Sequence, residues 1–470
     1  MTISPTPPAA ANPHIFRQYD IRGVVGRDLS PEVAHALGRA FGSTVRRACA
    51  GDAERTPRVA LGRDNRVSSN DLAAALRDGL LASGIDVIDV GTVPTPVLYF
   101  AGAHLATDAA VQVTGSHNPP EYNGFKLSIG GRSIYGDAIQ GLRQVIVRGD
   151  FVSGEGSVET REILPTYIDY LRTRFDVQRP LKVVVDCGNG TGSVVAVDLL
   201  RSLTPDLEVV PLFCESDGTF PNHHPDPVVD ENLVDLQTKV REIGADIGIA
   251  FDGDADRIGA VDERGEIIRG DLLLLLFGID LVERRGRGQK VVFDVKCSQA
   301  LSEGLEKVGG VPVMSATGHS LIKERMRKEG ALLAGELSGH ICFADDYYGF
   351  DDALYAACLL ISIVSSRNEP LSQRVAGFPS FVSTAEIRYP ATEEQKFPVV
   401  HSAIEHFSKD REVIDVDGAR VLFGDGWGLI RASNTEPVLV ARYEARTSED
   451  LDRIRKEMEG WLQDQGVDVS

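Results

Sequence analysis

A threefold recurrence of one strand pattern constrains the fold of this chain more than any other feature. Residues 58–64, 182–186 and 290–294 each run through β-branched and other apolar side chains to an aspartate. A short run of this kind, bounded by polar residues, is typical of a buried parallel strand. A helical pattern, a second apolar strand, another helical pattern and a third strand follow each run. This alternation predicts three similar mixed α/β domains.

The polar motifs of the chain directly follow the third strand of each repeat. They are TGSHN at 114–118, DGDADR at 252–257 and GELSGH at 335–340. Ligands of open α/β sheets bind beyond the carboxyl ends of the strands. We therefore expect these loops to converge on one central cleft.

The last part of the chain has a different pattern, which predicts a smaller α+β domain. Strand-like segments at 382–388, 419–423, 427–431 and 438–443 precede a helical pattern at 449–463. A chain of 470 residues is also too long for one hydrophobic core. The expected domains are 1–161, 162–266, 267–379 and 380–470, in which 1–13 is a Pro- and Ala-rich disordered leader.

Charge and cysteine usage exclude some classes of partner and compartment. A net charge of −20 argues against nucleic-acid binding, which requires a basic surface, although a local cation cluster can still bind phosphate. The six cysteines are scattered and form no CxxC pair, so we expect reduced thiols in a cytoplasmic protein. The apolar stretch 272–277 is far shorter than the roughly 20 residues that cross a bilayer, and we expect no membrane partner.

The aspartates at 252, 254 and 256 predict a metal site. Their spacing directly after an apolar strand, with Gly253 and Ala255 between them, lets the carboxylates turn toward one point. Grouped carboxylates repel one another unless a cation neutralises them, and hard oxygen ligands suit Mg²⁺. The alternative is a solvated acidic turn, which is common for isolated Asp-Gly pairs.

Ser116 alone would be interpreted as the N-cap of a helix after a strand. It does not form a hydrolase triad with His117, because adjacent side chains rarely face each other, and no GxSxG elbow is present. The wider segment 114–126, TGSHNPPEYNGFK, is more specific. Its Asn-Pro and Asn-Gly turns direct the chain back, so that Lys126 brings a cation toward the serine.

Two further motifs offer groups that suit a sugar phosphate. Glu336 and Ser338 can hydrogen-bond vicinal hydroxyls, and His340 can exchange a proton near neutral pH. In the segment 431–437, RASNTEP, Arg431 supplies a fork for a phosphate. The alternative is a turn with a helix cap for the segment 335–340 and a surface turn for the segment 431–437.

Together these motifs resemble those of the α-D-phosphohexomutases, most closely the bacterial phosphomannomutase/phosphoglucomutase group. The resemblance rests on TGSHNP at 114–119, DGDADR at 252–257, GELSGH at 335–340 and RASNTEP at 431–437, and it runs from about Ile15 to the C-terminus. It implies a heart-shaped molecule with one motif per domain around a central cleft. Leu337 and Asn434 favour the mannose/glucose group over the glucosamine group.

The resemblance also implies roles for individual residues. Ser116 would be the phosphoserine, and its phosphate would bind Mg²⁺ together with Asp252, Asp254 and Asp256. The implied catalytic residues are Ser116, His117, Lys126, Arg22, Arg257 and His340. The implied substrate-binding residues are Tyr19, Lys296, Thr317, Gly318, His319, Glu336, Ser338, Arg431, Ser433, Asn434 and Thr435.

The function that this resemblance implies is the interconversion of hexose 1-phosphate and hexose 6-phosphate, of mannose or glucose. Phospho-Ser116 would form a hexose 1,6-bisphosphate, which turns over and returns its other phosphate; Lys126 and His340 are the candidate bases. The expected partners are small sugar phosphates, and the expected state is a monomer, with a dimer as the alternative. Two other functions stay open: a Mg²⁺-dependent sugar phosphatase with Asp252 as nucleophile, and a non-catalytic sugar-phosphate sensor.

Overall fold

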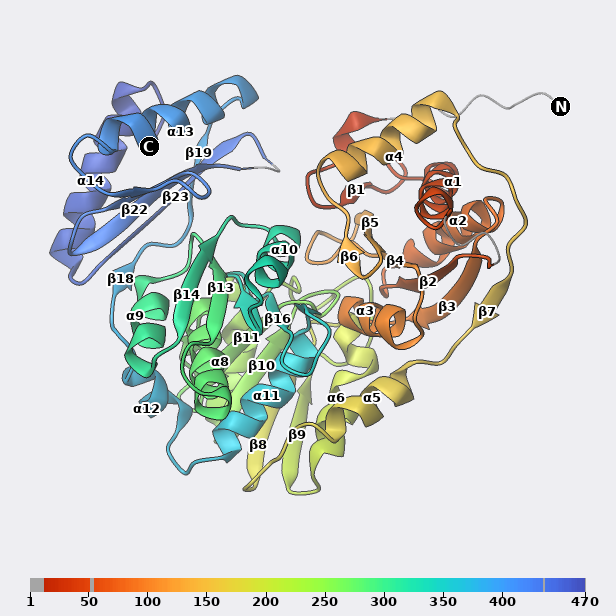
Figure 1. Cartoon of the computed structure of the whole chain (residues 1–470). Coiled ribbons are helices and arrows are strands. Elements are labelled where there is room, and N and C mark those ends of the chain that lie inside the picture. Colours follow the sequence, from red (N-terminus) through yellow and green to blue (C-terminus); the bar gives the residue numbers. More distant parts are fainter. Residues whose placement is uncertain (1–11, 51–54, 434–435, 470) are drawn as a thin grey trace. The chain divides into compact units, whose positions relative to one another are not determined.

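The computed structural model describes residues 12–50, 55–433 and 436–469 (Figure 1). The chain forms two compact units, and we describe each by itself. The first unit comprises Met1–Arg269 and Ser338–Ser372, and the second comprises Gly270–Leu337 and Gln373–Ser470. The expected leader at 1–13 lies almost entirely outside the described residues.

The first repeat folds into a seven-stranded mixed sheet covered by helices. β2 pairs in parallel with β3 and β4, whereas β5 runs antiparallel to both β4 and β1. The elements are β1 (Ile21–Val24), α1 (Pro31–Ala48), β2 (Arg58–Arg63), α2 (Ser69–Leu81), β3 (Asp86–Thr92), α3 (Thr95–His104), β4 (Ala109–Val113), β5 (Tyr122–Ile129), β6 (Arg132–Ser133), α4 (Asp137–Arg148) and β7 (Val158–Thr160).

Local sequence explains how α1 begins and how it packs. Ser30 caps its N-terminus by accepting a hydrogen bond from the Val33 amide, and Pro31 occupies the first turn, where no amide donor is needed. α1 packs against α2, and Gly38 and Gly79 lie where the two backbones approach most closely. The apolar faces of both helices join the sheet in one hydrophobic core.

The second repeat forms a five-stranded sheet in the order β12-β11-β10-β8-β9. β10 is parallel to β8 but antiparallel to β11, so the chain reverses at 252–257. The elements are α5 (Leu164–Arg172), β8 (Leu181–Asp186), α6 (Ala196–Leu203), β9 (Leu207–Leu212), α7 (Val234–Ile243), β10 (Ile247–Phe251), β11 (Ile258–Asp262) and β12 (Ile267–Ile268). β16 (Ile341–Phe343), β17 (Phe350–Asp351) and α11 (Ala353–Ser365) also belong to this unit, and α11 contacts β11 and α6.

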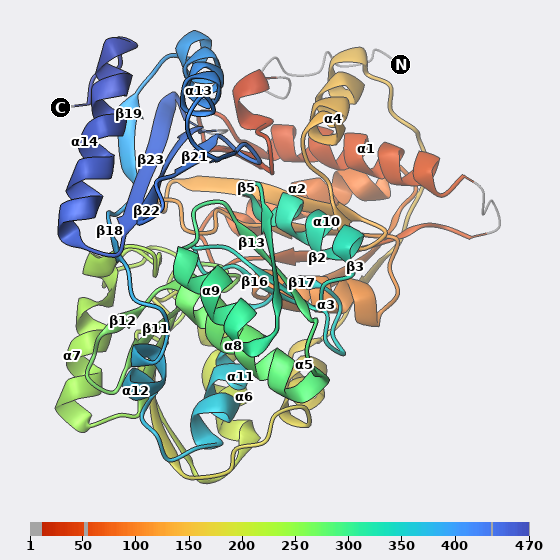
Figure 2. The same cartoon turned by 60° about the vertical axis from the view of Figure 1, so that its left-hand side comes forward.

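The second unit contains the core of the third repeat and the C-terminal domain. β13 (Lys290–Asp294) pairs in parallel with β14 (Val311–Ser315) and β15 (Leu333–Gly335), and the accompanying helices are α8 (Gly270–Arg285), α9 (Gln299–Val308) and α10 (His319–Glu329). After α12 (Leu371–Ala376), the last domain forms an antiparallel sheet against which α13 (Glu393–Phe407) and α14 (Ser448–Asp464) pack (Figure 2). Its strands are β18 (Val382–Ser383), β19 (Ile387–Pro390), β20 (Val413–Ile414), β21 (Ala419–Leu422), β22 (Gly426–Ala432) and β23 (Val438–Ala445).

The prediction of three α/β domains followed by an α+β domain is confirmed. One detail is wrong, because the single strand expected at 382–388 is divided into β18 and β19, which pair with different parts of β23. Glu386 lies in the break and directs its carboxylate to the Lys296 amine at 2.5 Å. The break between β18 and β19 therefore contains an ion pair with Lys296, which follows β13.

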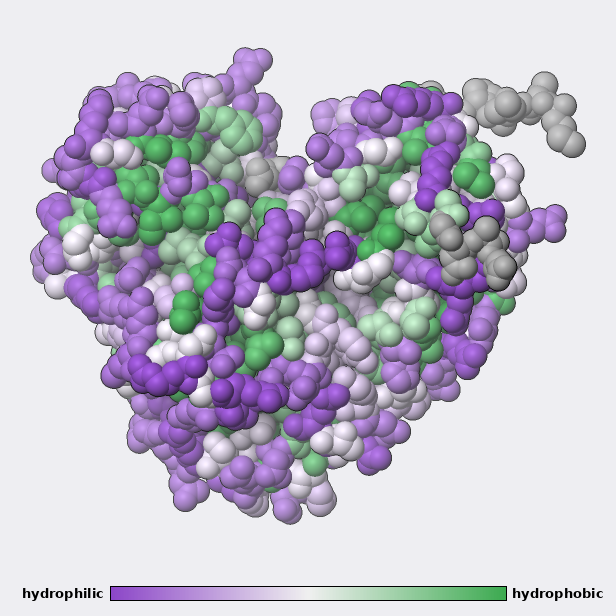
Figure 3. All heavy atoms as spheres, viewed as in Figure 1, coloured by the Kyte–Doolittle hydropathy of each residue, from purple (hydrophilic) through white to green (hydrophobic). Residues whose placement is uncertain are grey.

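Hydrophilic side chains cover most of the face shown in Figure 3, and apolar side chains are exposed only in smaller areas. This distribution agrees with the charge of the chain. Within residues 12–50, 55–433 and 436–469, no helix has both the length and the hydropathy needed to span a membrane.

Candidate active site

Ser116 lies in the loop between β4 and β5, with its backbone in the left-handed region at φ 48°. The side chain of Thr114 accepts the Ser116 amide at 2.8 Å, which stabilises this unusual conformation. The antiparallel pairing of β4 with β5 places Lys126 opposite Gln112, close to the end of β4. The predicted return of Lys126 toward the serine therefore follows from sheet register.

The Ser116 hydroxyl contacts two groups at the same distance. Its Oγ lies 3.0 Å from Nδ1 of His117 and 3.0 Å from Oδ2 of Asp252. The expectation that the neighbouring Ser116 and His117 side chains would not face each other is wrong, because the left-handed backbone at Ser116 turns them together. Loss of solvent around the His117 ring, with Arg257 and Arg22 nearby, lowers its pKa well below the ordinary value, so the ring is neutral.

The three aspartates of the 252–256 loop are fully buried, and their carboxylates lie within 4.8 Å of one another. Asp252 Oδ1 accepts the amides of Asp256 at 3.0 Å and Arg257 at 3.1 Å, which folds the loop back on itself. Burial, followed by the charges of Asp256 and Asp254, raises the pKa of Asp252 well above its usual range. Ionised carboxylates grouped in this way require cations.

Lys126 supplies one such cation. Its Nζ lies 2.7 Å from Asp254 Oδ2 and also pairs with Asp256, and Thr95 donates to the same Asp254 oxygen at 2.5 Å. Burial alone would lower the pKa of Lys126, but Asp254 and Asp256 outweigh that effect and raise it well above the ordinary value. Lys126 is therefore charged in this environment, and it lowers the pKa of Asp254.

The remaining oxygens of this group fit a metal ion. Asp254 Oδ1 and Asp256 Oδ1 are buried and accept no hydrogen bond. Buried carboxylate oxygens without a donor are costly unless a cation binds them. Three carboxylates with a single paired lysine therefore form a donor set suited to a hard divalent cation.

The third motif contributes His340 to the same unit. Arg257 Nε donates to His340 Nε2 at 3.0 Å, and the two residues also form an isolated backbone bridge. On its other side His340 Nδ1 lies 3.0 Å from Asp351 and 3.5 Å from Asp256. The structure thus brings the predicted His340 beside the predicted Arg257 and the loop 252–256, called the aspartate loop below.

Three other predicted residues belong to the first unit: Arg22, which contacts the loop of Ser116, and Tyr19 and Ser338. The loop 114–121, which carries Ser116, is called the serine loop below. Arg22, on β1, donates to Asn118 Oδ1 in the serine loop and pairs with Asp20 at 2.5 Å. Tyr19 and Ser338 are half-buried. The first unit therefore brings together Ser116, His117, Lys126, Arg22, Asp252, Asp254, Asp256, Arg257 and His340.

In the second unit, Asp417 links predicted residues of two domains. Its Oδ2 accepts the Thr317 amide at 3.0 Å and Arg431 Nε at 3.0 Å. Nearby in the sequence, the Gly318 amide donates to Glu336 Oε1 at 2.6 Å. Asp417 therefore orients the predicted phosphate-binding Arg431.

Lys296, Ser433 and His319 are the remaining described candidates of this unit. Lys296 is buried between Glu386 at 2.5 Å and Asp294 at 3.9 Å, and these carboxylates outweigh burial and raise its pKa. Ser433 is buried and accepts the Glu436 amide at 3.2 Å. His319 is half-buried at the first position of α10. The predicted residues Asn434 and Thr435 lie outside the described part of the chain.

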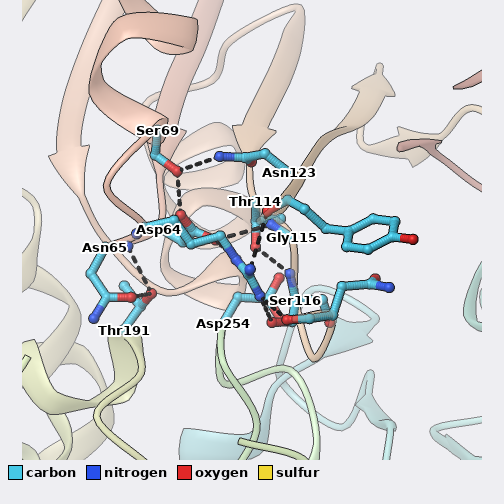
Figure 4. A network of polar contacts seen from close by, with 12 residues as sticks. Asp64, Asn65, Ser69, Thr114, Gly115, Ser116, Asn123, Thr191 and Asp254 are labelled. Atoms are coloured by element: carbon cyan, nitrogen blue, oxygen red, sulfur yellow. Dashed lines mark hydrogen bonds and ion pairs between the residues drawn. The ribbon is translucent and has the colours of Figure 1, made fainter. Parts of the chain in front are cut away.

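Sequence reasoning missed several residues that support these groups. Asp64 and Arg66 hold the serine loop through a network of polar contacts. Figure 4 shows Asp64 between Ser69 and Gly115 in this network. Thr95, Asp351 and Asp417 each contact a predicted residue. Arg66, Thr95, Asp351 and Asp417 stand outside the predicted motifs, and Asp64 was recognised only as the end of the first repeated strand run. Only the fold brings these residues to the site.

Comparisons with known proteins agree with these motifs. Four successive segments match the alpha/beta/alpha domains I, II and III and the C-terminal domain of phosphoglucomutase/phosphomannomutase; they are 13–153, 165–265, 269–381 and 386–460. The chain belongs to the phosphoglucomutase/phosphomannomutase family.

Relatives with similar sequences support the same assignment. The chain is 48% identical over 457 residues to the phosphomannomutase/phosphoglucomutase of Pseudomonas aeruginosa, covering 96% of this chain and 95% of that protein. It is 44% identical over 450 residues to a phosphoglucomutase of Neisseria gonorrhoeae, covering 94% and 95%. A crystal structure of a phosphoglucomutase/phosphomannomutase family protein from Burkholderia thailandensis matches with a TM-score of 0.89 and 43% identity, covering 96% of this chain and 98% of that one.

Proposed function

We propose that this protein is a phosphohexomutase that interconverts hexose 1-phosphates and hexose 6-phosphates of glucose or mannose. The names of the relatives, phosphomannomutase/phosphoglucomutase and phosphoglucomutase, support this activity and this substrate class. The observation that carries the proposal is the position of Ser116, whose Oγ lies 3.0 Å from Asp252 within a buried group of carboxylates and cations. In this proposal Ser116 carries the phosphoryl group, and a hexose 1,6-bisphosphate is the intermediate.

The metal in this proposal is one Mg²⁺ ion held by Asp252, Asp254, Asp256 and the phosphate of Ser116. The two carboxylate oxygens that accept no hydrogen bond support this assignment. When bound, the ion would neutralise charge on the transferring phosphoryl oxygens.

Cationic side chains of the protein would neutralise the rest of the negative charge on the transferring phosphoryl group. Phosphoryl transfer depends mainly on positioning and on compensating negative charge. Lys126, already charged between Asp254 and Asp256, and Arg257, which donates to His340, lie in this group. Because Lys126 is held as a cation, His340 is the better candidate for accepting the proton of the sugar hydroxyl.

We assign recognition of the distal part of the substrate to the residues of the other motifs. Glu336 and Ser338 would read sugar hydroxyls, and Arg431 would grip the second phosphate through its planar fork. The ion pair of Arg431 with Asp417 at 3.0 Å supports the phosphate-binding role, because it fixes the guanidinium. The remaining proposed binding residues are Tyr19, Lys296, Thr317, Gly318, His319, Ser433, Asn434 and Thr435.

The proposal also covers the domain boundaries, the compartment and the oligomeric state of the protein. The family matches begin and end close to residues 161, 266 and 379, which we propose as the domain boundaries. We further propose a cytoplasmic monomer that acts on free sugar phosphates.

An intact-mass measurement of purified protein tests the proposal. After incubation with hexose 1,6-bisphosphate, the wild type is expected to carry one phosphoryl group and to convert hexose 1-phosphate to hexose 6-phosphate. Ser116→Ala is expected to lose both properties. Ser202→Ala, whose hydroxyl donates only to the Leu199 carbonyl in α6, is the matched control and should keep both. An adduct on an aspartate, or stoichiometric release of free phosphate, would support the phosphatase alternative instead.

A further inference from the structure

The segment that follows β2, Asp64-Asn65-Arg66, reaches both the serine loop and the second domain. Figure 4 shows Asp64 beside Gly115 and Asn65 beside Thr191. Arg66 is among the largest fully buried side chains of the described chain. An arginine is rarely buried unless its donors are satisfied by fixed acceptors. Its surroundings therefore indicate a specific structural task.

Arg66 donates to four carbonyl oxygens, three in the serine loop and one at the first residue of β5. Its Nη2 reaches Ser116 O at 2.7 Å and Asn118 O at 2.6 Å. Its Nη1 reaches Pro119 O at 2.6 Å and Tyr122 O at 3.1 Å. The planar guanidinium thus gathers carbonyls along an irregular loop and at the start of β5, which a lysine amine cannot reproduce.

Asp64 completes this clamp from the other side. Its Oδ2 pairs with Arg66 Nε at 3.1 Å and accepts the Gly115 amide at 3.0 Å. The guanidinium lies so close to Gly115 that a Cβ there would come within 2.5 Å of Arg66 Cζ. The backbone directly before Ser116 is therefore fixed between a carboxylate and a guanidinium.

Asn65 ties the same segment to the second domain. Its amide side chain donates to Asn189 O at 2.7 Å and Ser216 Oγ at 2.9 Å, and its backbone amide donates to Thr191 Oγ1 at 3.3 Å. The Thr191 amide in turn donates to Gly253 O, within the aspartate loop, at 2.8 Å. A continuous chain of contacts thus connects the serine loop with the aspartate loop.

We propose that Asn65 and Arg66 are positioning residues that hold Ser116 in register with Asp252, so that the phosphoryl group passes to the sugar rather than to water. The inference rests on the proposed mutase function. Transfer between oxygens requires alignment of the reacting atoms, and a displacement of about 1 Å can cost about a hundredfold in rate. Neither residue contacts the reacting oxygen, so their effect is on geometry.

The test compares transfer with hydrolysis in Arg66→Lys and in the milder Asn65→Ala. Each protein is phosphorylated with hexose 1,6-bisphosphate, and two rates are measured: phosphate release to water, and kcat for hexose 1-phosphate. We expect kcat to fall by about tenfold to a hundredfold while KM stays within about twofold, and the ratio of hydrolysis to transfer to rise by about tenfold.

Arg179→Lys is the matched control, because Arg179 also donates to main-chain carbonyls, those of Arg367 and Val364, and its ion pair is with Asp246. It should lower the melting temperature without changing the ratio. The inference is overturned if the ratio in Arg66→Lys and Asn65→Ala equals that of the wild type. If the wild type itself carries no phosphoryl group on Ser116, the proposed function fails instead.

An independent observation concerns Cys187 and Cys214, whose sulfur atoms lie 3.0 Å apart. Cys187 follows β8 and is buried, whereas Cys214 follows the neighbouring β9 and is half-buried. The pKa of Cys214 is lowered, first by its contact with Cys187, and that of Cys187 is raised by the same contact and by burial. A partly accessible thiol whose sulfur lies 3.0 Å from that of a buried one is the arrangement of an attacking and a resolving cysteine.

We further infer that Cys187 and Cys214 form a reversible disulfide when a peroxide oxidises them. The Cys214 thiolate would attack one peroxide oxygen, giving a sulfenic acid and releasing hydroxide, which takes up a proton to become water. The Cys187 thiol would then attack that sulfur and displace a second water. Two thiols are oxidised and one peroxide is reduced. Cys187 begins the turn whose Thr191 amide holds Gly253, so the bond would disturb the aspartate loop.

Hydrogen peroxide treatment followed by peptide mapping tests this inference. The wild type is expected to yield a peptide linking Cys187 to Cys214 and to lose activity, which a dithiol reductant restores. Cys214→Ser should keep its activity under the same treatment. Cys49→Ser, which removes the other half-buried cysteine, should behave as the wild type does. The absence of the linked peptide, or an equal loss of activity in Cys214→Ser, overturns the inference.

Discussion

At the scale of single residues, Lys126 shows how charge is distributed in the candidate active site. It is the cation that contacts both Asp254 and Asp256, and all three side chains are buried. A buried ion pair contributes little when compared with an apolar replacement of both partners, but removing one partner leaves an uncompensated charge. Lys126 therefore matters for the stability of the metal-free protein, in addition to its proposed part in the chemistry.

Lys126→Met is expected to destabilise the metal-free protein by about 3–5 kcal/mol, because it leaves buried carboxylates without their cation. Urea unfolding in the presence of a chelator measures this change. The matched control is Lys182→Met, which removes a more exposed pair with Glu208 at 3.4 Å and should cost at most about 1 kcal/mol. Equal losses in the two variants would contradict the charge argument.

At the scale of elements, two glycines allow α1 and α2 to approach each other closely. A Cβ at Gly38 would collide with the Leu76 carbonyl, and one at Gly79 would collide with the His35 carbonyl. Both neighbours are helix backbone and cannot rotate away. The contact between these helices therefore depends on the missing side chains.

Gly79→Ala is expected to lower the free energy of unfolding by about 1–3 kcal/mol, because the added methyl group forces the helices apart. Gly141→Ala in α4 is the matched control, since a Cβ there meets nothing within 4 Å. That change should stabilise the protein by up to about 1 kcal/mol, because alanine favours a helix more than glycine does. Thermal unfolding of both variants checks that their free energies of unfolding change in opposite directions.

The N-terminus of α11 predicts a pH effect. Asp352 caps this helix by accepting the Tyr355 amide at 2.9 Å, and it also accepts the hydroxyls of Tyr347 at 2.7 Å and Tyr167 at 2.9 Å. Burial raises the pKa of its carboxyl to about 6. The folded state therefore holds this proton more tightly than the unfolded chain, in which the pKa is about 4.

Asp352→Asn keeps an oxygen for the cap but removes the titration. The stabilising contribution of protonated Asp352 is complete below pH about 4 and is lost as the pH rises through about 6, a loss on the order of 2–3 kcal/mol. The melting temperature of the wild type, relative to Asp352→Asn, should therefore fall across that range. Asp176→Asn, at an exposed position, should give a constant difference. A constant difference for Asp352→Asn would contradict the shifted pKa.

At the scale of the whole molecule, the repeated strand pattern was sufficient to predict the domain classes, because strand periodicity and motif position depend on local sequence. The serine loop and aspartate loop could be located for the same reason. Arg66 and Asp417 could not, because a lone arginine or aspartate has no pattern, and their contacts with Ser116 and Thr317 span 50 and 100 residues of sequence and are created only by folding. The backbone of Ser116 also depends on that clamp.

The division into two units gives a prediction for metal binding. Both tryptophans of the chain, Trp427 and Trp461, lie in the second unit, whereas the aspartates of the candidate metal site lie in the first. Mg²⁺ at a hundred times its dissociation constant should stabilise the unit that binds it by about 2.7 kcal/mol. We therefore expect Mg²⁺ to raise the temperature of one calorimetric transition while leaving the thermal transition of tryptophan fluorescence unchanged.

This expectation holds only if the two units unfold separately, and the comparison of two probes decides that point. Trp427 is buried and donates to Glu444 at 2.8 Å, so its fluorescence should respond when the second unit opens. Asp254→Asn is the control, because it removes a proposed metal ligand and should abolish the calorimetric shift. If Mg²⁺ moves the fluorescence transition by as many degrees as the calorimetric one, the units unfold as one cooperative body, since stabilisation of one unit then reaches the other.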